Sequence, residues 1–350
     1  MLFTTIKGHP DALAALHNAL KTERLAHAYL FVGPSGIGKK RTALALAQAV
    51  LCTENPGEGC GTCTACVSIT SGSHPDLRLV NPEAAKTTIG IDQVRELQHF
   101  LGLKSVRGNR KIAVLEEAHL LTSQAQSALL KMVEEPPGAA LLMLLSVNAA
   151  TLSRPLLSRC QQIRFAALPL AVVEELLVQE HAREPAEARA LALYSRGSLG
   201  YALSLNVEVF TEERQHVIEE LQQLHGASFS QVSRLAEWLV ASRTKKSQAK
   251  QKVQEVQKTI ETTETSASGD RLELVLSWYE EQLRYLLLGQ EGVIRYQDCL
   301  PAMTQAAQAL SVEEALRQLT LVYDTMQALG RNANARLAVE DMLLQISAQQ

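Results

Sequence analysis

Apolar and polar residues divide this chain of 350 residues into a first part that mixes strand and helix patterns and a later part that is helical throughout. Short apolar runs predict strands, and longer segments with an apolar residue at every third or fourth position predict helices. In chain order we predict a helix at 11–20, a strand at 27–32, a helix at 41–51, a strand at 76–80, a helix at 92–103, a strand at 111–115, a helix at 123–135, and strands at 141–147 and 161–165. This alternation predicts an α/β domain in which helices cover both faces of a parallel sheet.

The strand patterns end after Pro169. The next residues have the spacing of a few short helices, and the Leu- and Ala-rich sequence that follows remains helical to the end of the chain. Within it, residues 243–270 are polar, and we expect an exposed helix there that passes into a loop at 262–269. We therefore expect three domains: an α/β domain at 1–167, a small helical domain at 168–206 and an all-α domain at 207–350.

The composition is that of an ordinary globular protein. Apolar residues make up 46% of the chain, enough for well-formed cores, and the formal net charge of -3 gives no overall attraction to nucleic acid. No window approaches the roughly 18 apolar residues of a membrane span, and the first residues lack the pattern of a signal peptide. We therefore expect a cytoplasmic protein with no membrane partner, whose cysteines are free thiols or metal ligands rather than disulfides.

The first predicted strand is followed by the glycine-rich loop GPSGIGKK at 33–40. A strand, a glycine-rich loop and a helix in this order are typical of a P-loop, in which backbone N–H groups surround phosphates and a lysine reaches the outer ones. Lys40 stands where a Ser or Thr ordinarily holds Mg²⁺, so this metal ligand is missing. The loop either binds a nucleotide or a phosphate through Gly33, Gly36, Gly38 and Lys39, or it is vestigial and empty.

Polar residues come at the ends of later strands. Glu116 and Glu117 follow the strand at 111–115, where a P-loop ATPase holds Mg²⁺ with an Asp and activates water; a solvated acidic pair is the alternative. Asn148 follows the next strand, where a polar residue commonly senses the terminal phosphate, and a local cap is its alternative. Arg159 precedes the last strand, at a domain edge from which its planar cationic group can reach a phosphate bound by a neighbouring subunit.

Four cysteines follow the P-loop helix with the spacing C-x7-C-x2-C-x2-C: Cys52, Cys60, Cys63 and Cys66. Four thiolates so close in sequence suit tetrahedral Zn²⁺, and a site filled by four protein ligands is structural rather than catalytic. The alternative is a group of free thiols in a loop.

Together these residues resemble the clamp-loader branch of the AAA+ ATPases. The resemblance covers about residues 4–205, and its matching segments are HAYLF at 27–31 before the P-loop, the four-cysteine module, ALLKMVEEPP at 128–137 and Ser158-Arg159-Cys160. It implies an AAA+ P-loop domain, a small helical lid and an all-α collar domain that holds an oligomer together. It also implies the partners of a bacterial DNA polymerase III clamp loader: gamma or tau motor subunits, a delta subunit, a sliding clamp and primed DNA.

Three departures from the motor subunits of that family set the role that the resemblance implies. A motor subunit carries Thr or Ser at position 40, Asp at position 116, and a nucleotide-sensing arginine in the helix where this chain has Gly200-Tyr201-Ala202. The resemblance therefore implies a subunit that does not hydrolyse ATP and donates Arg159 in trans to a neighbouring ATP site during DNA replication. One alternative is an ATP-hydrolysing motor subunit like gamma or tau that uses Thr42 or water as the metal ligand. Another is a zinc-bearing P-loop protein outside replication.

The residues leave direct contact with DNA open. Lys104, Arg107, Arg110 and Lys111 form a basic cluster that can face a phosphate backbone, and the polar segment at 245–258 has the same character. A solvated loop is the alternative. Any such contact is expected to be independent of base sequence.

Overall fold

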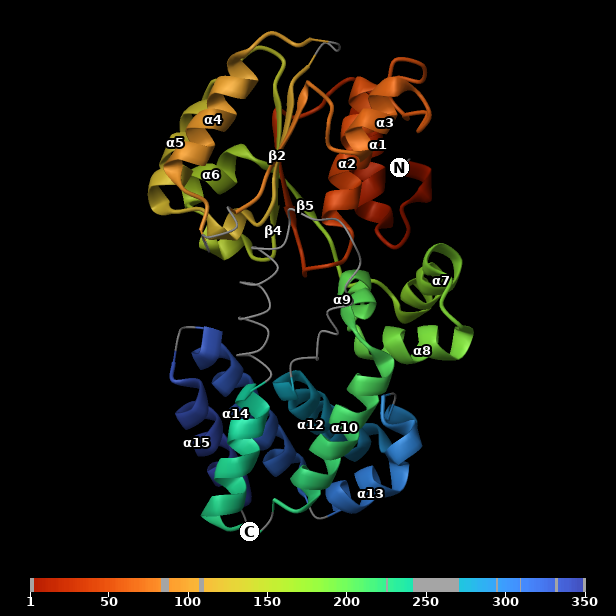
Figure 1. Cartoon of the computed structure of the whole chain (residues 1–350), viewed down its shortest axis with the longest axis vertical. Helices are drawn as coiled ribbons and strands as arrows, with labels where there is room; N and C mark the ends of the chain where they lie inside the picture. The colour runs from red at the N-terminus through yellow and green to blue at the C-terminus, as the bar shows by residue number, and fades with distance from the viewer. Residues whose placement is uncertain are drawn as a thin grey trace, which may run out of the picture. The chain divides into compact units, whose positions relative to one another are not determined.

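We describe the protein from a computed structural model of the full chain (Figure 1). The chain forms two compact units, Met1–Ala202 and Leu203–Gln350. Two predictions fall outside the described residues. They are the contact of Arg107 with a phosphate backbone and the exposed helix and loop at 243–270. The residues that the structure describes are 3–82, 88–106, 110–224, 226–241, 271–293, 295–308, 310–330 and 333–348.

The first unit is built on a sheet of five parallel strands in the order β2-β3-β4-β1-β5. Loops that follow neighbouring parallel strands leave the sheet at the same edge, which is where ligands of such sheets bind. The P-loop after β1 therefore meets the residues that follow β3 and β4. The strands are β1 (Ala28–Val32), β2 (Leu77–Val80), β3 (Ile112–Leu115), β4 (Leu141–Ser146) and β5 (Gln161–Arg164).

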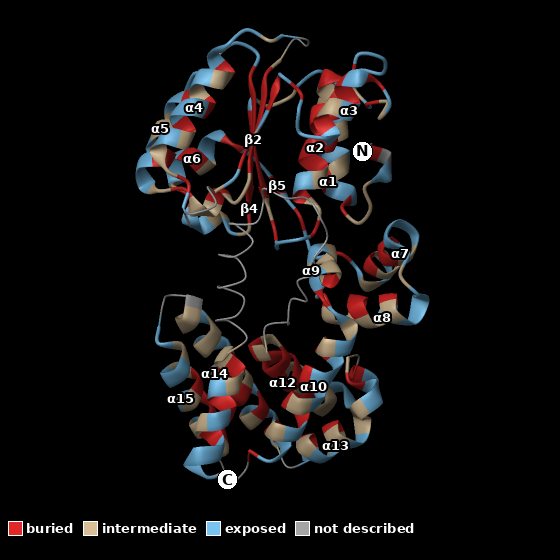
Figure 2. Cartoon of the chain, in the orientation of Figure 1, coloured by how far each residue is buried: buried red, intermediate tan, exposed pale blue. Residues whose placement is uncertain are grey.

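Helices cover both faces of this sheet (Figure 1). Because side chains alternate along a strand, β1 sends Tyr29 and Phe31 into the core beneath one layer of helices and Leu30 into the core beneath the other. The central strands β1, β3 and β4 are almost entirely buried (Figure 2), which explains their continuous apolar sequences. The first layer contains α1 (Pro10–Lys21), α2 (Lys39–Leu51) and α3 (Thr64–Thr70), and the second contains α4 (Ile91–Gly102), α5 (Ser123–Glu134) and α6 (Arg154–Arg159).

Short helices follow the sheet in the chain. Charged side chains tie the first of them, α7, to the residues around the P-loop helix. Lys7 pairs with Glu175 at 2.7 Å, and Arg41 makes a two-pronged ion pair with Glu180 at 2.5 and 3.0 Å. These helices are α7 (Leu170–His181), α8 (Pro185–Tyr194) and α9 (Leu199–Ser204), and the unit also contains the 3-10 helices η1 (Phe3–Thr5), η2 (Ala118–Leu120) and η3 (Ala149–Thr151).

The second unit is helical in its described residues. Among the described residues of the whole chain, none of the helices combines the length and the apolar character that crossing a bilayer requires. The helices of this unit are α10 (Val207–Gln222), a helix at 229–241, α12 (Arg271–Leu288), α13 (Leu300–Gln308), α14 (Val312–Gly330) and α15 (Ala335–Ser347), joined in places by the 3-10 helices η4 (Gly289–Gly292) and η5 (Gln297–Cys299).

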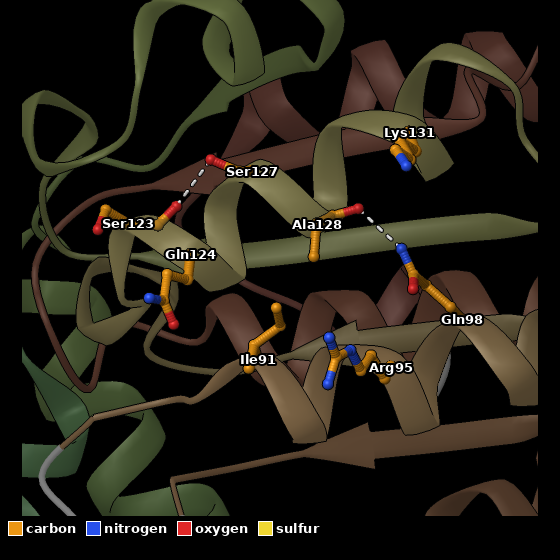
Figure 3. Close-up of a pocket in the computed structure, with 8 residues that line it drawn as sticks. All are labelled: Ile91, Arg95, Gln98, Ser123, Gln124, Ser127, Ala128 and Lys131. Carbon is orange, nitrogen blue, oxygen red and sulfur yellow. Dashed lines mark hydrogen bonds between the residues drawn. The ribbon is translucent and has the colours of Figure 1, made fainter.

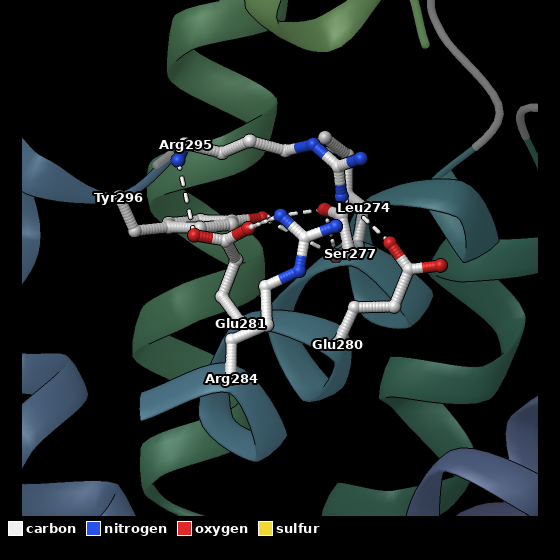
Figure 4. Close-up of polar contacts among 7 residues, drawn as sticks. All are labelled: Leu274, Ser277, Glu280, Glu281, Arg284, Arg295 and Tyr296. Carbon is white, nitrogen blue, oxygen red and sulfur yellow. Dashed lines mark hydrogen bonds and ion pairs between the residues drawn. The ribbon is translucent and has the colours of Figure 1, made fainter. Parts of the chain in front are cut away.

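Polar contacts fix α12 to the segment that follows it (Figure 4). Glu281 is fully buried; it accepts a hydrogen bond from the backbone N–H of Arg295 at 3.0 Å and pairs with Arg284 at 3.2 Å. The side chain of Arg295 pairs with Glu280 at 2.6 Å. Partnered in this way, the buried charge of Glu281 is compatible with a stable helical core.

The structure confirms the predicted elements of the first unit, with ends shifted by one or two residues. The P-loop helix, for example, begins at Lys39 rather than Arg41. The sequence pattern does not predict α3 and α6, because helices of 7 and 6 residues contain too few positions to display a helical period. The division into three domains stays a prediction.

Candidate functional site

The loop between β1 and α2 has the backbone shape of a phosphate-binding loop. Gly36 and Gly38 have φ angles of 73° and 104°, which favour glycine, and a Cβ on Gly33 would lie 2.1 Å from the carbonyl oxygen of Phe165. In the part of the chain that the structure describes, no hydrogen bond uses the backbone N–H of Gly36, Ile37 or Gly38. These donors lie at the N-terminus of α2, where the helix dipole also favours an anion.

Lys39 is folded back onto this loop. Its Nζ donates to the carbonyl oxygens of Gly33 and Pro34, both at 2.6 Å, and the residue is buried. Burial lowers the pKa of Lys39, while the negative charge of Glu117 opposes that change. The cradle of N–H groups is therefore present, and a phosphate that engages Lys39 has to replace two carbonyl oxygens.

Lys40 lies on the side of the loop where a P-loop ATPase holds its metal. Its Nζ forms an ion pair with Oε1 of Glu116 at 2.7 Å; the two side chains are 48% and 17% exposed. Both residues line a pocket of about 530 Å³, together with Lys39, Glu117 and Ser146. An ammonium group thus contacts the first carboxylate after β3, the position from which a P-loop ATPase holds Mg²⁺.

Thr42 does not replace the hydroxyl that is missing at position 40. Thr42 is fully buried, and its Oγ1 donates to the carbonyl oxygen of Gly38 at 3.1 Å. Its side chain does not line the pocket that contains Lys40 and Glu116. The geometry therefore gives no support to Thr42 as a substitute metal ligand.

The first turn of α9 lies directly on the P-loop. Ser198 Oγ donates to the carbonyl oxygen of Ser35 at 2.9 Å, and the N–H of Gly200 donates to that of Gly36 at 2.8 Å. The backbones approach so closely that a Cβ on Gly200 would lie 2.8 Å from the Cα of Gly36. No side chain fits at position 200 unless α9 and the loop move apart.

Glu117 and Asn148 have local partners. Glu117 adopts a left-handed backbone with φ of 52°, which is uncommon outside glycine, and pairs with His119 at 3.4 Å. Asn148 is exposed, its Oδ1 accepts the N–H of Ala150 at 2.8 Å, and it does not line the pocket. The contact with Ala150 is the local cap that the sequence left as the alternative, and phosphate sensing by Asn148 stays a prediction.

Arg159 is the last residue of helix α6, is exposed, and does not line the pocket that contains Lys40 and Glu116. Its guanidinium pairs with Glu134 at 2.9 Å and donates to the carbonyl oxygen of Pro155 at 3.0 Å; the side chains of Arg159 and Glu134 are 40% and 45% exposed. Next to it, burial raises the pKa of the Cys160 thiol to about 11, which keeps that thiol unreactive. Arg159 is thus accessible to a second molecule and held by contacts that exchange easily.

The four cysteines of the module after α2 converge. Their Sγ atoms all lie within 4.8 Å of one another, with 3.8 Å between Cys52 and Cys63 and 4.0 Å between Cys60 and Cys66. Four sulfurs around Zn²⁺ at about 2.3 Å stand roughly 3.8 Å apart, so the arrangement fits zinc. Backbone N–H groups of Asn55, Cys63 and Cys66 donate to the sulfurs of Cys52, Cys60 and Cys63.

Two of these thiols differ in their pKa. Burial acts to raise the pKa of Cys63, but N–H donors from Cys66 and Thr53 outweigh it and lower the pKa to about 6. Burial raises the pKa of Cys66 to about 12. A bound cation would favour the thiolate of both, because metal binding and loss of the thiol proton are coupled.

Comparison with known proteins finds similarity to subunits of DNA polymerase III. A family model described as DNA polymerase III, delta subunit, matches residues 8–169. The delta' subunit of DNA polymerase III from Bacillus subtilis (strain 168) is 28% identical over 341 residues, which cover 96% of this chain and 95% of that protein. The delta' subunit of Pseudomonas aeruginosa is 39% identical over 202 residues, 57% of this chain and 61% of that protein. This chain is similar to delta' subunits of DNA polymerase III.

Similarity to delta' subunits leaves the question of ATP hydrolysis to the residues of the site. The tau subunit of Escherichia coli (strain K12) is also similar, 35% identical over 209 residues that span 58% of this chain and 32% of that protein. Among solved structures, a gamma-subunit-related protein of DNA polymerase III from Thermotoga maritima matches 96% of this chain and 99% of its own with a TM-score of 0.41 and 15% identity. Since delta' and tau proteins both match, similarity alone does not decide between these two kinds of subunit.

The prediction of a basic cluster that can face a phosphate backbone is wrong for Lys111. Lys111 is buried, pairs with the fully buried Asp76 at 3.3 Å and lies 4.2 Å from the ring centre of Phe100. Asp76 also accepts from the hydroxyl of Ser105 and the N–H of Val106, at 2.9 and 2.8 Å. Lys111 therefore holds the preceding loop in place and is not available to a phosphate backbone.

A polar groove that the sequence pattern did not single out lies between α4 and α5 (Figure 3). It contains two cationic side chains, Arg95 on α4 and Lys131 on α5, and none of the described residues that line it is acidic. The signal in the sequence is the spacing of Ser123, Ser127 and Lys131, which places three polar residues on one face of α5. The lining residues are Ile91, Arg95, Gln98, Ser123, Gln124, Ser127, Ala128 and Lys131.

Proposed function

We propose that this subunit of the DNA polymerase III clamp loader does not hydrolyse ATP, and that it supplies Arg159 to the ATP site of a neighbouring subunit while a sliding clamp is loaded onto primed DNA. The observation that carries the proposal is the ion pair between Lys40 and Glu116 at 2.7 Å. It puts a protein cation on the carboxylate that a hydrolysing P-loop subunit uses for Mg²⁺.

The loss of hydrolysis follows from what Mg²⁺ does in phosphoryl transfer. The ion bridges the β- and γ-phosphates and neutralises charge that develops on them, and a P-loop hydroxyl and an acidic strand end hold it. Here the hydroxyl is absent at position 40 and the carboxylate is already paired. Glu116 is also longer than the usual Asp by one methylene, which moves its carboxylate by ~1.5 Å. A misplacement of about 1 Å in a catalytic site can cost a factor of roughly 10².

Weak binding of a nucleotide or a phosphate remains part of the proposal. Gly36, Ile37 and Gly38 keep their N–H groups free of other hydrogen bonds in the described structure, and such donors at a helix N-terminus attract anions without any metal. The loop would then have a structural role, since binding fixes its position without leading to cleavage.

The exposed position of Arg159 supports its role in trans. An arginine finger stabilises charge on the transferred phosphoryl group and is worth about 10³–10⁵ in rate at the site that it serves. The ion pair with Glu134 is half-exposed, so its contribution to stability is within about 1 kcal/mol. Arg159 can therefore exchange Glu134 for a phosphate at little cost, because charge-assisted bonds to phosphate are at least as strong.

The four-cysteine module is proposed to hold a structural zinc ion through Cys52, Cys60, Cys63 and Cys66. Zinc would supply folding free energy and no catalysis, because four thiolates leave no open position on the metal. The thiols themselves position the module: Cys52 follows the P-loop helix, and the last ligand lies in α3.

The partners proposed for this chain are those of the clamp loader: gamma or tau motor subunits, a delta subunit, a sliding clamp and primed DNA. Assembly is assigned to the predicted all-α domain at 207–350. Contact with DNA is assigned to the groove between α4 and α5 rather than to Lys111, since the cations and hydroxyls there suit a phosphate backbone without base readout.

The experiment is ATP turnover by a complex reconstituted from this chain, the ATP-hydrolysing subunits, the clamp and primed DNA. We expect Arg159→Ala to remove the ATP turnover that comes from the neighbouring subunit's ATP site, which Arg159 serves. Arg159→Lys should remain impaired, because lysine lacks the planar fork. Arg154→Ala is the matched control, since Arg154 is an exposed arginine at the other end of α6, and it should turn over like the wild type.

Three outcomes would count against the proposal. Equal turnover with wild type and Arg159→Ala, in complexes of the same composition by light scattering, would refute the finger. Equal losses in Arg159→Ala and Arg154→Ala would point to damage to α6 rather than to a lost catalytic contact. Turnover by the isolated chain would favour the alternative, an ATP-hydrolysing motor subunit like gamma or tau.

A further inference from the structure

The four-cysteine module lies against the P-loop helix and contributes to the P-loop pocket. Helix α2 begins at Lys39, and the first thiol, Cys52, is the residue after its end. Helix α3, which carries Cys66, packs beside α2 (Figure 1). The last residue of α3, Thr70, lines the pocket of about 530 Å³ together with Lys40. A candidate metal ligand and a residue of the pocket wall thus lie one turn apart on the same short helix.

One buried side chain joins the module to the pocket wall. Gln48 in α2 is fully buried, and its Nε2 donates to the carbonyl oxygen of Cys66 and to Oγ1 of Thr70, both at 2.9 Å. Oγ1 of Thr70 in turn donates to the same carbonyl oxygen at 3.1 Å. Leu44, one turn before Gln48 on α2, also lines the pocket. These three residues therefore form a closed set of hydrogen bonds between the module and the wall.

The buried amide of Gln48 depends on Cys66 and Thr70. Its Oε1 has no hydrogen-bond partner among the described residues, so its two bonds are those that Nε2 donates. The module also packs against it, since a Cβ on Gly59 would lie 3.4 Å from the Cβ of Gln48. A buried donor that loses its acceptor cannot turn to water, which is unfavourable. A displacement of Cys66 therefore has to move Gln48 or Thr70 as well.

The position of Cys66 depends in turn on its thiol. The Sγ atom of Cys66 lies within 4.8 Å of the other three sulfurs of the module. Metal binding at such sites is coupled to the folding of the segments that supply the ligands. A bound ion would fix Cys66 and with it α3, and loss of the ion would leave α3 free to shift.

We propose that Gln48 is a positioning residue that links the cysteine module to the P-loop pocket. When the cysteines hold a metal ion, Gln48 keeps Thr70 in the pocket wall, and when they do not, this wall loosens. An anion in the pocket should then bind more tightly to the metal-bound protein, because less of the wall has to be ordered on binding. By linkage, the anion should strengthen metal binding by the same factor. The inference rests on the proposed zinc and phosphate sites and is independent of the role proposed for Arg159.

The test is NMR on the full chain with labelled threonine methyl groups and backbone amides. Thr70→Val identifies the Thr70 methyl signal, and zinc-loaded protein is compared with protein whose zinc has been removed by a chelator and dialysis. Sulfate is the probe for the pocket, because it resembles a phosphate and binds zinc only weakly. We expect loss of zinc to shift or broaden the Thr70 signal. We also expect sulfate to bind the zinc-loaded protein about threefold to tenfold more tightly, as read from the N–H signals of Gly36 and Gly38.

Two glutamine variants make the test specific. Gln48→Leu removes the amide and keeps the size of the side chain, and its affinity for sulfate should no longer depend on zinc. Gln126→Leu is the matched control, because Gln126 is also a buried glutamine of the first unit, 8% exposed. Its side chain bonds instead to the backbones of Leu121, Thr151 and Ser153, so this variant should keep the wild-type dependence on zinc. The remaining threonine signals show whether each variant is folded.

Failure of the link can be told apart from failure of the two sites. Saturable sulfate binding with the same affinity in zinc-loaded and zinc-free wild type would overturn the link, and so would a dependence on zinc that persists in Gln48→Leu. Loss of that dependence in both glutamine variants would overturn the role of Gln48 and point to general damage. A purified chain that takes up no zinc by metal analysis, or that shows no saturable sulfate shift, would refute the proposed sites and the link together.

Discussion

Lys40→Thr and Lys40→Met separate two ways in which position 40 can keep Mg²⁺ from the P-loop. Threonine removes the ammonium and restores a hydroxyl ligand, whereas methionine removes the ammonium and restores nothing. If the positive charge of Lys40 is what excludes the metal, the two variants should behave alike. If the missing ligand is what matters, only the threonine variant should gain affinity for magnesium-bound nucleotide.

The structure gives the size of each effect. The pair between Lys40 and Glu116 is 2.7 Å long, but Lys40 is 48% exposed and can turn into solvent. Moving Lys40 away from Glu116 breaks an exposed ion pair, which costs about 0.2–1 kcal/mol. This cost corresponds to a loss of up to roughly fivefold in affinity for magnesium-bound nucleotide. A polar ligand to a charged group contributes about 1.5–3 kcal/mol, or roughly ten- to hundredfold. The missing hydroxyl should therefore dominate.

The assay is titration of a fluorescent ATP analogue with and without Mg²⁺, and the readout is the ratio of the two affinities. This ratio cancels the direct attraction between Lys40 and the nucleotide. We expect little magnesium dependence in the wild type, at most about a fivefold gain for Lys40→Met, and a gain of about tenfold or more for Lys40→Thr. Equal gains in the two variants, or strong magnesium dependence in the wild type, would refute the reasoning.

Three other predictions concern the zinc module, a buried ion pair and pH. Removing zinc with a chelator, or the substitution Cys63→Ser, should lower the temperature of the first unfolding transition in calorimetry, because structural zinc supplies folding free energy. Calorimetry that finds no effect of the chelator would contradict the zinc assignment. Lys111→Met leaves Asp76 buried without its partner and should cost about 3–5 kcal/mol in urea unfolding; a cost below about 1 kcal/mol would show that the loop does not depend on the pair. A hydrogen bond from Arg41 lowers the pKa of Glu180 in the folded protein. This pair therefore stabilises fully above the unfolded pKa of about 4.3 and is lost as the pH falls through the lower folded value. Glu180→Gln should be less stable than the wild type at pH 7, by up to about 1 kcal/mol, and equal to it in strong acid; a difference that persists in strong acid would contradict the assignment.

Much of the fold could be predicted from the sequence because the strands are buried on both faces. Continuous apolar runs such as LLMLLS at 141–146 allow little but a central strand, and the proline pair at 136–137 stops the helix before it. The order of the strands could not be predicted in the same way. It depends on which strands pair across long connections, and an apolar run carries no mark of its neighbour.

The candidate site shows the same division between local and non-local information. The glycines of the P-loop and the cysteine spacing are local patterns, and the structure brings each set together. The partners of charged side chains are not local. The basic residues around Lys111 in the sequence predict an exposed cation. In the structure, Lys111 instead pairs in the core with Asp76, which precedes a different strand.

The contact of α9 with the P-loop is a further case that the sequence does not disclose. Gly200 lies far from Gly36 in the chain, and only the folded structure shows that their backbones touch. The sequence shows only that an arginine is absent at this position, whereas the structure gives a steric reason for a residue without a side chain.

The most direct test of the central claim is ATP turnover by the purified chain alone in the presence of Mg²⁺, compared with its Lys39→Ala variant. We predict that both preparations hydrolyse ATP only at the background rate. Turnover by the wild-type chain that Lys39→Ala abolishes would show a functional ATPase and would contradict a subunit whose catalytic contribution is made at its neighbour's site.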